Sequence, residues 1–273
     1  DDGLNHRVAH SHRFEDTRCE IEYQGAKPFI AAGVLDGAER VFGLHTAHDL
    51  RSGTIGLKPG LNNAAVDHFR VEVHGKSTHV STPHLGTDAL YIASQIVVAV
   101  QGLVTRMTSP TEPVIIGIGC LNAGTTYNAV AEHAVMEGTT RTVSQESRDR
   151  IRRLVTETAD SIAAIYGGTA EIVWTDFAAA LINDAEVCRE AAAVADSLLG
   201  EGHVVTDREL SLSGDNFAEF ELYRPGAYAY LGTGNPDKPH TVISNHNGGF
   251  DVDEDALVTG AALYAGYALA RLG

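Results

Sequence analysis

Cysteine, long apolar runs and basic residues are all scarce in this sequence. Its three cysteines, Cys19, Cys120 and Cys188, are widely spaced and form no Cys-x-x-Cys pair. This spacing argues against a disulfide framework and is typical of a reducing compartment, so we expect a cytoplasmic protein. No run of about eighteen apolar residues and no basic leader followed by an apolar segment occurs, so the sequence predicts neither a membrane span nor a signal peptide.

Acidic residues outnumber basic ones, with 36 Asp and Glu against 20 Lys and Arg, and the formal net charge is −16. A surface of this sign repels phosphate groups, so we expect neither nucleic acid nor an anionic membrane as a partner. The rest of the composition is that of an ordinary globular protein. A chain of 273 residues that is 44% hydrophobic suffices for two domains, each with its own core.

Residues 66–175 have the pattern of a complete small domain. Apolar side chains alternate with polar ones in the predicted strands and recur every three or four residues in the predicted helices. The expected elements are strand 69–73, helix 87–106, strands 114–121 and 131–143, helix 144–166 and strand 170–174. Thr87 and Ser144 are the expected N-caps, and Gly167 with Gly168 closes the second helix. The order βαββαβ predicts a ferredoxin-like fold, in which two helices cover one face of a four-stranded antiparallel sheet.

The segments on both sides of this domain alternate between helices and short apolar strands. The expected elements are a helix at 25–34, strands at 40–44, 54–57, 204–205 and 226–231, and helices at 184–199 and 253–271. Such alternation predicts one α/β domain that the central domain interrupts. Residues 1–24 are polar and rich in His and Arg, and we assign them no structure. His10 and His12 in this segment are minor candidates as metal ligands.

Two further histidines are stronger candidates as metal ligands. His45 follows an apolar strand, and His246 lies in a polar loop before the last helix. Loops that follow strands are the usual place for sites in α/β proteins, and neutral imidazole is the commonest protein ligand for metals. A solvent-exposed loop histidine without a ligand is the alternative at both positions.

A second group of polar residues belongs to the central domain. His79 stands between a strand and a helix, where it either donates to a ligand or forms part of a capping loop. Asn128 and Arg141 suit a substrate carboxylate, because guanidinium binds a carboxylate through two parallel hydrogen bonds. An ion pair between Arg141 and Glu137 on the strand surface is equally simple. Outside this domain, Asp215 is either an acid at a helix start or the N-cap of that helix.

Short motifs spread from residue 25 to residue 271 carry a family likeness. They are Gly25-Ala26-Lys27, Phe42-Gly43-Leu44-His45, the segment 75–84, Gly138-Thr139-Thr140-Arg141, Gly214-Asp215-Asn216-Phe217 and the segment 250–257. In this order they resemble the M20 metallopeptidase family, and within it the amidohydrolases that split N-acyl amino acids such as hippurate. The resemblance implies an α/β protein with a catalytic domain at 1–64 and 179–273. A ferredoxin-like lid and dimerisation domain at 65–178 would interrupt it.

The resemblance also implies a function and a set of residue roles. A pair of divalent metal ions, Zn, Mn or Co, would assist hydrolysis of the amide bond in N-acyl amino acids or small peptides. His45 and His246 match metal ligands. His79 matches a lid histidine that reaches across a homodimer to stabilise the tetrahedral intermediate. Asn128 and Arg141 match the groups that hold the substrate carboxylate.

The sequence before Gly25 departs from the family pattern. The family's upstream Cys-Gly-His-Asp motif is absent from it. Aligned on Gly25, the family's Glu-Glu pair falls on Glu20, the expected general base, and on Ile21, which cannot bind a metal. Two other hypotheses therefore stay open. One is a catalytically impaired relative that binds a carboxylate ligand or acts as a dimeric interaction protein, and the other is a mononuclear site made by His45, His246 and Glu20.

Overall fold

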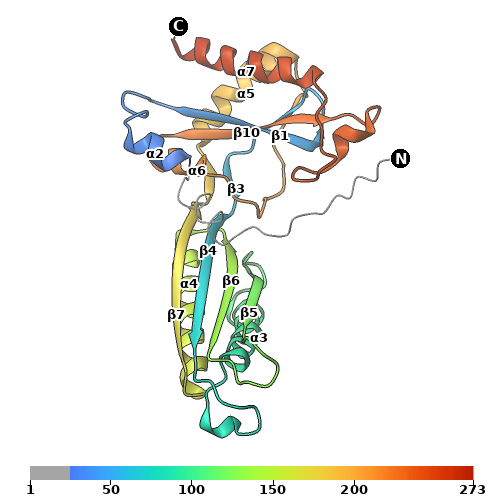
Figure 1. Ribbon diagram of the computed structural model, residues 1–273. Coiled ribbons are helices and arrows are strands. Elements are labelled where there is room, and N and C mark those ends of the chain that lie inside the picture. The colour runs from blue at the N-terminus through green and yellow to red at the C-terminus, as the bar shows by residue number, and fades with distance from the viewer. Residues whose placement is uncertain (1–24, 273) are drawn as a thin grey trace, which may run out of the picture.

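The computed structural model describes residues 25–272. Four residues singled out in the sequence lie outside this range: His10, His12, Glu20 and Ile21. The molecule is elongated, with two domains placed end to end (Figure 1). The first domain holds the first and last described elements, whereas one continuous stretch, from β4 (Ala65–His74) to β7 (Thr169–Ala178), forms the second. Sheets and helices are mixed in both domains, and the predicted α/β fold class is confirmed.

The sheet of the first domain is built on two long parallel strands. Its order is β1-β10-β2-β9, with β1 (Val41–Arg51) parallel to β10 (Gly226–Gly234). The short strands β2 (Ile55–Gly56) and β9 (Val204–Val205) extend the sheet beyond β10. Both long strands run past their predicted ends, because main-chain pairing continues where the apolar pattern stops.

Side-chain alternation gives this sheet a core face and an open face. Every second residue of β10 from Ala227 to Leu231 is buried beneath α5 (Ala185–Leu199) and α7 (Asp255–Leu272). These two helices cover one side of the sheet (Figure 1). Since successive strand side chains point to opposite faces, Tyr228 points away from the helices. The remaining elements are α2 (Ala26–Ala31), β3 (Gly60–Asn63), β8 (Leu181–Asn183), α6 (Ala218–Glu221) and the 3-10 helix η2 (Pro239–Val242).

The second domain has the predicted βαββαβ order. Its elements after β4 are the 3-10 turn η1 (Pro83–Leu85), α3 (Ala89–Met107), β5 (Ile115–Ala123), β6 (His133–Thr142), α4 (Gln145–Ile165) and β7. The sheet is antiparallel throughout in the order β5-β6-β4-β7. Both helices pack on one face of this sheet, as in ferredoxin-like folds (Figure 1). The other face is left open, and β5 and β7 are the edge strands.

Local sequence signals place the helix ends of this domain. Asp88 caps α3 by accepting hydrogen bonds from two main-chain N–H groups, at 3.0 and 3.2 Å. The prediction of Thr87 as this cap is wrong by one residue, because Asp caps at least as well as Thr. Ser144 caps α4 as predicted, with a hydrogen bond of 3.1 Å. Gly167 ends α4 at a φ of 76°, which residues with a Cβ rarely adopt.

Within residues 25–272 one helix, α3, is long enough and apolar enough to cross a membrane, judged by length and composition alone. No such segment was expected from the sequence. The inner side of α3, including Ile92, Ile96 and Val100, is buried against the sheet. Packing into the core of the second domain therefore accounts for the apolar character of this inner side, whereas other apolar side chains of α3, including Val98, are exposed.

A buried ion cluster ties α4 to the sheet near the junction of the two domains. Asp67 of β4 is 1% exposed and shares the helix-covered face with the apolar core. Its carboxylate accepts hydrogen bonds from Arg148, at 2.5 and 3.0 Å, and from Arg152 one turn later. Partial burial would raise the pKa of Asp176, but its hydrogen bond from Arg152 and the nearby cations hold this pKa below its usual range. A buried carboxylate requires such partners, since it has lost its hydration.

We expect Asp67→Asn to lower the free energy of unfolding of the second domain by about 3 kcal/mol, because it leaves two guanidinium groups without their buried anion. Trp174 is the only tryptophan of the chain and packs in this domain, so urea unfolding followed by its fluorescence measures the effect. The control is Asp149→Asn, an exposed position on α4, which should change stability by less than ~0.5 kcal/mol. Equal effects of the two substitutions would contradict the assignment.

Candidate metal-binding pocket

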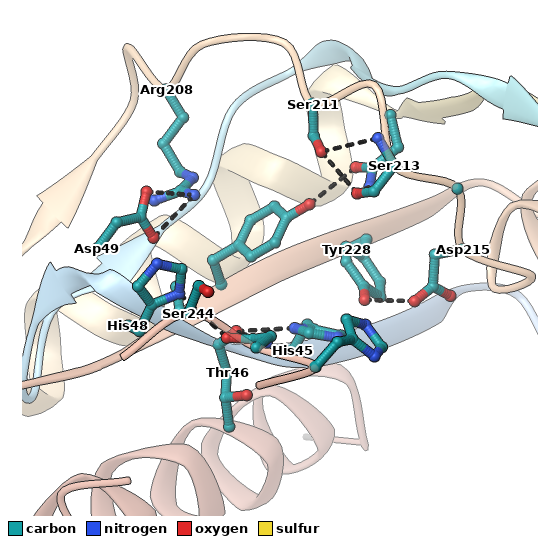
Figure 2. Close-up of a pocket in the computed structure, with 16 residues that line it drawn as sticks. His45, Thr46, His48, Asp49, Arg208, Ser211, Ser213, Asp215, Tyr228 and Ser244 are labelled. Carbon is teal, nitrogen blue, oxygen red and sulfur yellow. Dashed lines mark hydrogen bonds and ion pairs between the residues drawn. The ribbon is translucent and has the colours of Figure 1, made fainter. Parts of the chain in front are cut away.

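A pocket of about 400 Å³ opens on the face of the first sheet opposite α5 and α7 (Figure 2). Its lining comes from residues 45–49 of β1, from Asn63 at the end of β3, from Arg208, Ser211 and residues 213–215, from Tyr228 and Tyr230 of β10, and from the loop 244–246. These segments are distant in sequence and converge beside the middle of two parallel strands. A pocket that several distant segments line is the usual form of a ligand site.

Strand pairing positions His45 in this pocket. His45 lies inside β1 opposite Tyr230 of β10, and its ring centroid is 6.1 Å from that of Tyr228 and 6.2 Å from that of Tyr230. The sequence placed His45 in a loop after a strand, and this placement is wrong. β1 continues beyond His45 because its pairing with β10 persists as far as Ala47 and Gly232.

The hydrogen bonding of His45 fits a metal ligand. Its Nδ1 lies 2.7 Å from the carbonyl oxygen of Thr46. A carbonyl only accepts, so Nδ1 carries the proton and donates it, and the Nε2 lone pair is left for another partner. Histidines that bind metals usually donate their other ring N–H to a carbonyl or carboxylate in this way.

His246 joins the same pocket from a strained loop. Its φ is 64°, and it is the only non-glycine residue with positive φ among residues 25–272. This conformation costs on the order of 1–2 kcal/mol, so the surroundings must hold it. The neighbouring Asn245 does so, because its side-chain oxygen accepts from His48 Nδ1 at 3.1 Å and its side-chain nitrogen donates to the Thr46 carbonyl at 3.4 Å. The loop is thereby tied to β1, and His45 and His246 line one cavity.

Sequence reasoning missed most of the other residues of the pocket. They are His48, Asp49, Asn63, Arg208, Tyr228 and Tyr230. The alternation of Ala and Tyr in β10 was a visible signal of a strand with two different faces. His48 carried no such signal, because its odd spacing from His45 predicts the opposite face. An irregular register after Ala47 lets it line the pocket.

Arg208 is held in place on the pocket wall. Its guanidinium carbon lies 4.5 Å above the ring centre of Tyr230, and its Nη2 is 3.1 Å from the Asp49 carboxylate. The Tyr230 hydroxyl in turn donates to the side-chain oxygen of Asn63 at 2.8 Å. The cation is therefore stacked and paired at once, which fixes its position beside the pocket.

Asp215 is a pocket residue in the turn that leads into α6. One carboxylate oxygen accepts from the main-chain N–H of Phe217 at 2.8 Å, and the other accepts from the Tyr228 hydroxyl at 2.6 Å (Figure 2). Burial, followed by this hydrogen bond, raises the pKa of Tyr228 well above its usual value. The phenol therefore stays protonated and acts as a donor. Asp215 thus lines the pocket as an acid close to a helix start, whereas the alternative that it is the N-cap of α6 is wrong, because Phe217 occupies that position without a side-chain cap.

Glu221 at the end of α6 is a largely buried acid. One of its oxygens accepts from the main-chain N–H of Ile182 at 3.0 Å, whereas Oε1 is buried without a hydrogen-bond partner among the described residues. Burial is the main cause that raises its pKa to about 7, and the negative charges of Asp184 and Asp215 add to the shift. Glu221 is therefore neutral in the folded protein at acidic pH and becomes charged near neutrality.

His79 and Asn128 lie at the far end of the second domain. The main-chain N–H of Val80 donates to the carbonyl of Asn128 at 3.2 Å, and His79 is bridged to Ala129, so the two segments are neighbours. His79 is exposed, and its Nδ1 is 2.7 Å from the Ser81 hydroxyl. Within one chain neither residue reaches the pocket.

Arg141 lies at the opposite end of the same sheet. It is eight residues along β6 from His133, so roughly 25 Å separate it from the end that holds Asn128. Arg141 does not pair with Glu137. It donates instead to the Thr139 hydroxyl at 2.6 Å and to a main-chain carbonyl. Its strand neighbour Val66 packs against Gly214 of the pocket wall, so Arg141 stands near the pocket.

Fold and site together define a two-domain α/β protein in which a histidine-lined pocket adjoins a ferredoxin-like domain formed by the middle of the chain. Residues 64–183 match the peptidase dimerisation domain of the M20 family. The chain is 35% identical over 242 residues to thermostable carboxypeptidase 1 of Saccharolobus solfataricus, covering 88% of this chain and 60% of that protein. It is 35% identical over 234 residues to N-acetyl-L-cysteine deacetylase of Bacillus subtilis, covering 86% and 54%.

Solved structures show the same similarity. The YXEP protein of Bacillus subtilis, described as a dinuclear metal binding peptidase from the M20 family, superposes with a TM-score of 0.73 at 30% identity, over 90% of this chain and 61% of that one. The chain is thus similar to M20 proteins in sequence and in fold, and its residues 64–183 match the dimerisation domain of that family. It spans about 60% of the length of curated relatives that it matches.

The raised pKa of Glu221 predicts a pH-dependent loss of stability. Because the folded state binds this proton more tightly than the unfolded state, stability falls as pH rises from about 4.5 to about 7 and is then constant. We expect Glu221→Gln to exceed the wild type by less than about 1 kcal/mol at pH 5 and by about 3 kcal/mol at pH 8. Urea unfolding followed by circular dichroism at both pH values measures this.

The matched control for this prediction is Glu201→Gln, an exposed carboxylate in a turn of the same domain. It should leave the pH dependence of the wild type unchanged. A stability difference between Glu221→Gln and the wild type that is the same at pH 5 and at pH 8 would show that Glu221 does not titrate in this range.

Proposed function

We propose that this chain forms part of a metal-dependent hydrolase that cleaves the amide bond of N-acyl amino acids or small peptides. The observation that carries the proposal is one pocket lined by both His45 and His246, in which Nε2 of His45 is free. The names of the matched relatives, a carboxypeptidase and an N-acetyl-L-cysteine deacetylase, belong to the same class of reaction.

The donor set of the pocket suits divalent transition metals. His45 and His246 would hold the metal, for which Zn, Mn and Co are the candidates. Among the described residues they form no group of three close ligands with a further His, Cys, Asp or Glu. A bound metal ion supplies a water of lowered pKa and polarises the substrate carbonyl. We assign the general base to Glu20 on the sequence alone, so its carboxylate would take the proton of the attacking water.

Arg141 is the proposed anchor for the substrate carboxylate. Partial burial lowers the pKa of its guanidinium, yet a guanidinium stays charged at neutral pH. No described carboxylate lies within ion-pair distance of it, whereas Arg148 and Arg152 are fully paired. A cation that is partly buried, close to the pocket and without an anion suits a negatively charged ligand.

The uncharged side of the second domain is the proposed homodimer interface. The edge strand β5 carries no charge, and α3 carries none before Arg106. Apolar side chains are exposed there, including Val98 at 69%. The other edge differs, because α4 and β7 carry many charged residues. A two-fold contact through α3 and β5 would bury the uncharged surface and is consistent with the dimerisation domain that matches this segment.

This dimer would complete the site. A two-fold axis through the β5 edges makes the two sheets run antiparallel, so the far end of one lies beside the near end of the other. His79 and Asn128 of one chain would then approach Arg141 and the pocket of the partner. In that position His79 would donate a hydrogen bond to the oxyanion of the tetrahedral intermediate, and Asn128 would bind the substrate carboxylate.

Either pocket histidine should be essential. We expect His45→Ala and His246→Ala to lower kcat/KM for N-acetyl amino acids or hippurate at least about 100-fold in Mn²⁺ or Zn²⁺, because each removes a metal ligand. Activity assays, with metal content by mass spectrometry, measure both effects, and a chelator should abolish wild-type turnover. His203→Ala, at an exposed surface histidine, is the control and should retain activity.

Full activity of His45→Ala would contradict the proposal. A wild type without turnover that binds an N-acyl amino acid in calorimetry, with this binding lost in Arg141→Ala, would instead support the alternative of a carboxylate-binding relative. The observation that favours this alternative is Ile21 at the position of a metal ligand.

Subunit complementation tests the shared site. We expect His79→Ala and His246→Ala to be inactive alone, and their mixture after subunit exchange to recover about a quarter of wild-type activity. Half of the random dimers are mixed, and each mixed dimer has one intact site. If both substitutions affected the same site within one chain, the mixture would stay inactive. Mixing His45→Ala with His246→Ala is the matched control, which should recover nothing.

A further inference from the structure

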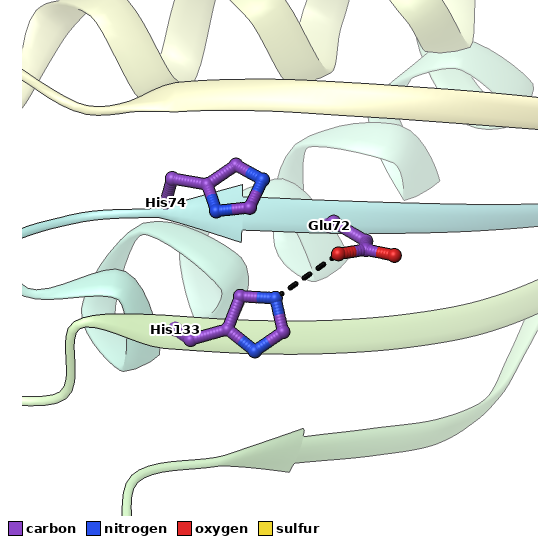
Figure 3. Close-up of side chains that lie close together, drawn as sticks. All are labelled: Glu72, His74 and His133. Atoms are coloured by element: carbon purple, nitrogen blue, oxygen red, sulfur yellow. Dashed lines mark hydrogen bonds and ion pairs between the residues drawn. The ribbon is translucent and has the colours of Figure 1, made fainter.

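The open face of the second sheet carries a group of metal-ligand side chains outside the pocket (Figure 3). His74, the last residue of β4, lies directly opposite His133, the first residue of β6. Glu72 precedes His74 by two residues, so strand alternation places it on the same face. The antiparallel register alone therefore brings two imidazoles and a carboxylate together.

The distances within this group approach those of a metal site. Candidate ligand atoms of Glu72, His74 and His133 all lie within 4.8 Å of one another. Glu72 Oε2 and His133 Nε2 are 3.2 Å apart, and the two imidazole centroids are 5.2 Å apart. Tetrahedral zinc with ligand bonds of about 2.0–2.2 Å needs ligand atoms about 3.3 Å apart. One pair already has this spacing, and small side-chain rotations would bring in the third atom.

The charges around the group favour a cation. Arg70 pairs with Oε1 of Glu72, which orients the carboxylate and leaves Oε2 on the histidine side. Glu171 of β7 lies directly opposite Glu72 on the other flank of β4 and is exposed. Carboxylates directly opposite each other on paired strands repel, and a cation beside them relieves this repulsion. The other histidine of this face, His68, is 3.3 Å from Glu137 and has no second imidazole beside it.

We propose that Glu72, His74 and His133 form a second, mononuclear site for a divalent transition metal of the zinc class. Two imidazoles and one carboxylate are a known zinc ligand set, and water fills the fourth position where such a site is open. The side chain of His133 is 46% exposed, so this site faces solvent. It is independent of the pocket at His45 and His246, which belongs to the other domain.

Zinc binding by variants of the metal-free protein tests the proposal. Competition with a chromophoric chelator gives the stoichiometry and Kd at pH 7.5. We expect His74→Ala and His133→Ala each to lose one bound Zn²⁺ per chain or to weaken its Kd at least about 100-fold.

Two controls keep the result specific. His68→Ala removes a histidine from the same face and should retain the site, and the double variant His45→Ala, His246→Ala should retain it even where hydrolysis is lost. Trp174 fluorescence verifies that each variant is folded. Unchanged zinc binding in His74→Ala and His133→Ala, or an equal loss in His68→Ala, would overturn the proposal. The group would then be an ion pair between Glu72 and His133 only.

Discussion

The parallel pairing of β1 with β10 is the constraint on which the first domain depends. Because neighbouring strand residues point to opposite faces, one register decides two things at once. It buries Ala227 to Leu231 at every second position under α5 and α7, and it presents His45 with the tyrosines of β10 to the opposite side. The core and the pocket are therefore two faces of one sheet. A shift of this register by one residue would place the imidazole in the core and the apolar residues in the pocket.

The sheet of the second domain also has one face that forms the core and one face that is open. The helix-covered face of its sheet holds the apolar core and the buried Asp67, whose charge is balanced by two arginines of α4. The open face carries alternating charges and histidines, including the group around His133. A polar open face is ordinary for an antiparallel sheet with one solvated side, and here the strand pairing also places possible ligands in a fixed register. Rigid strands are a good scaffold for such a register, since they define side-chain positions better than loops do.

The length of the second domain explains why an isolated chain does not assemble the site that the family likeness implies. Arg141 stands beside the pocket, whereas His79 and Asn128 are at the far end of the same sheet. No rotation of side chains spans that distance. The surface of α3 and β5 lacks charge, in contrast to the edge formed by α4 and β7, and so suits contact with a second chain. Such a contact would place the end of one sheet that holds His79 beside the end of the other that holds Arg141.

The sequence by itself determined the order of elements and the fold class, because periods of two and of about 3.6 residues and good capping residues are local signals. Ser144 and Gly167 show this, and the error at Thr87 arose only because Asp88 is an equally good cap. Motifs also singled out His45 and His246. Tertiary structure alone decided which residues surround them, because the register irregularity that re-aims His48 and the convergence of distant segments follow from long-range pairing that no local pattern encodes.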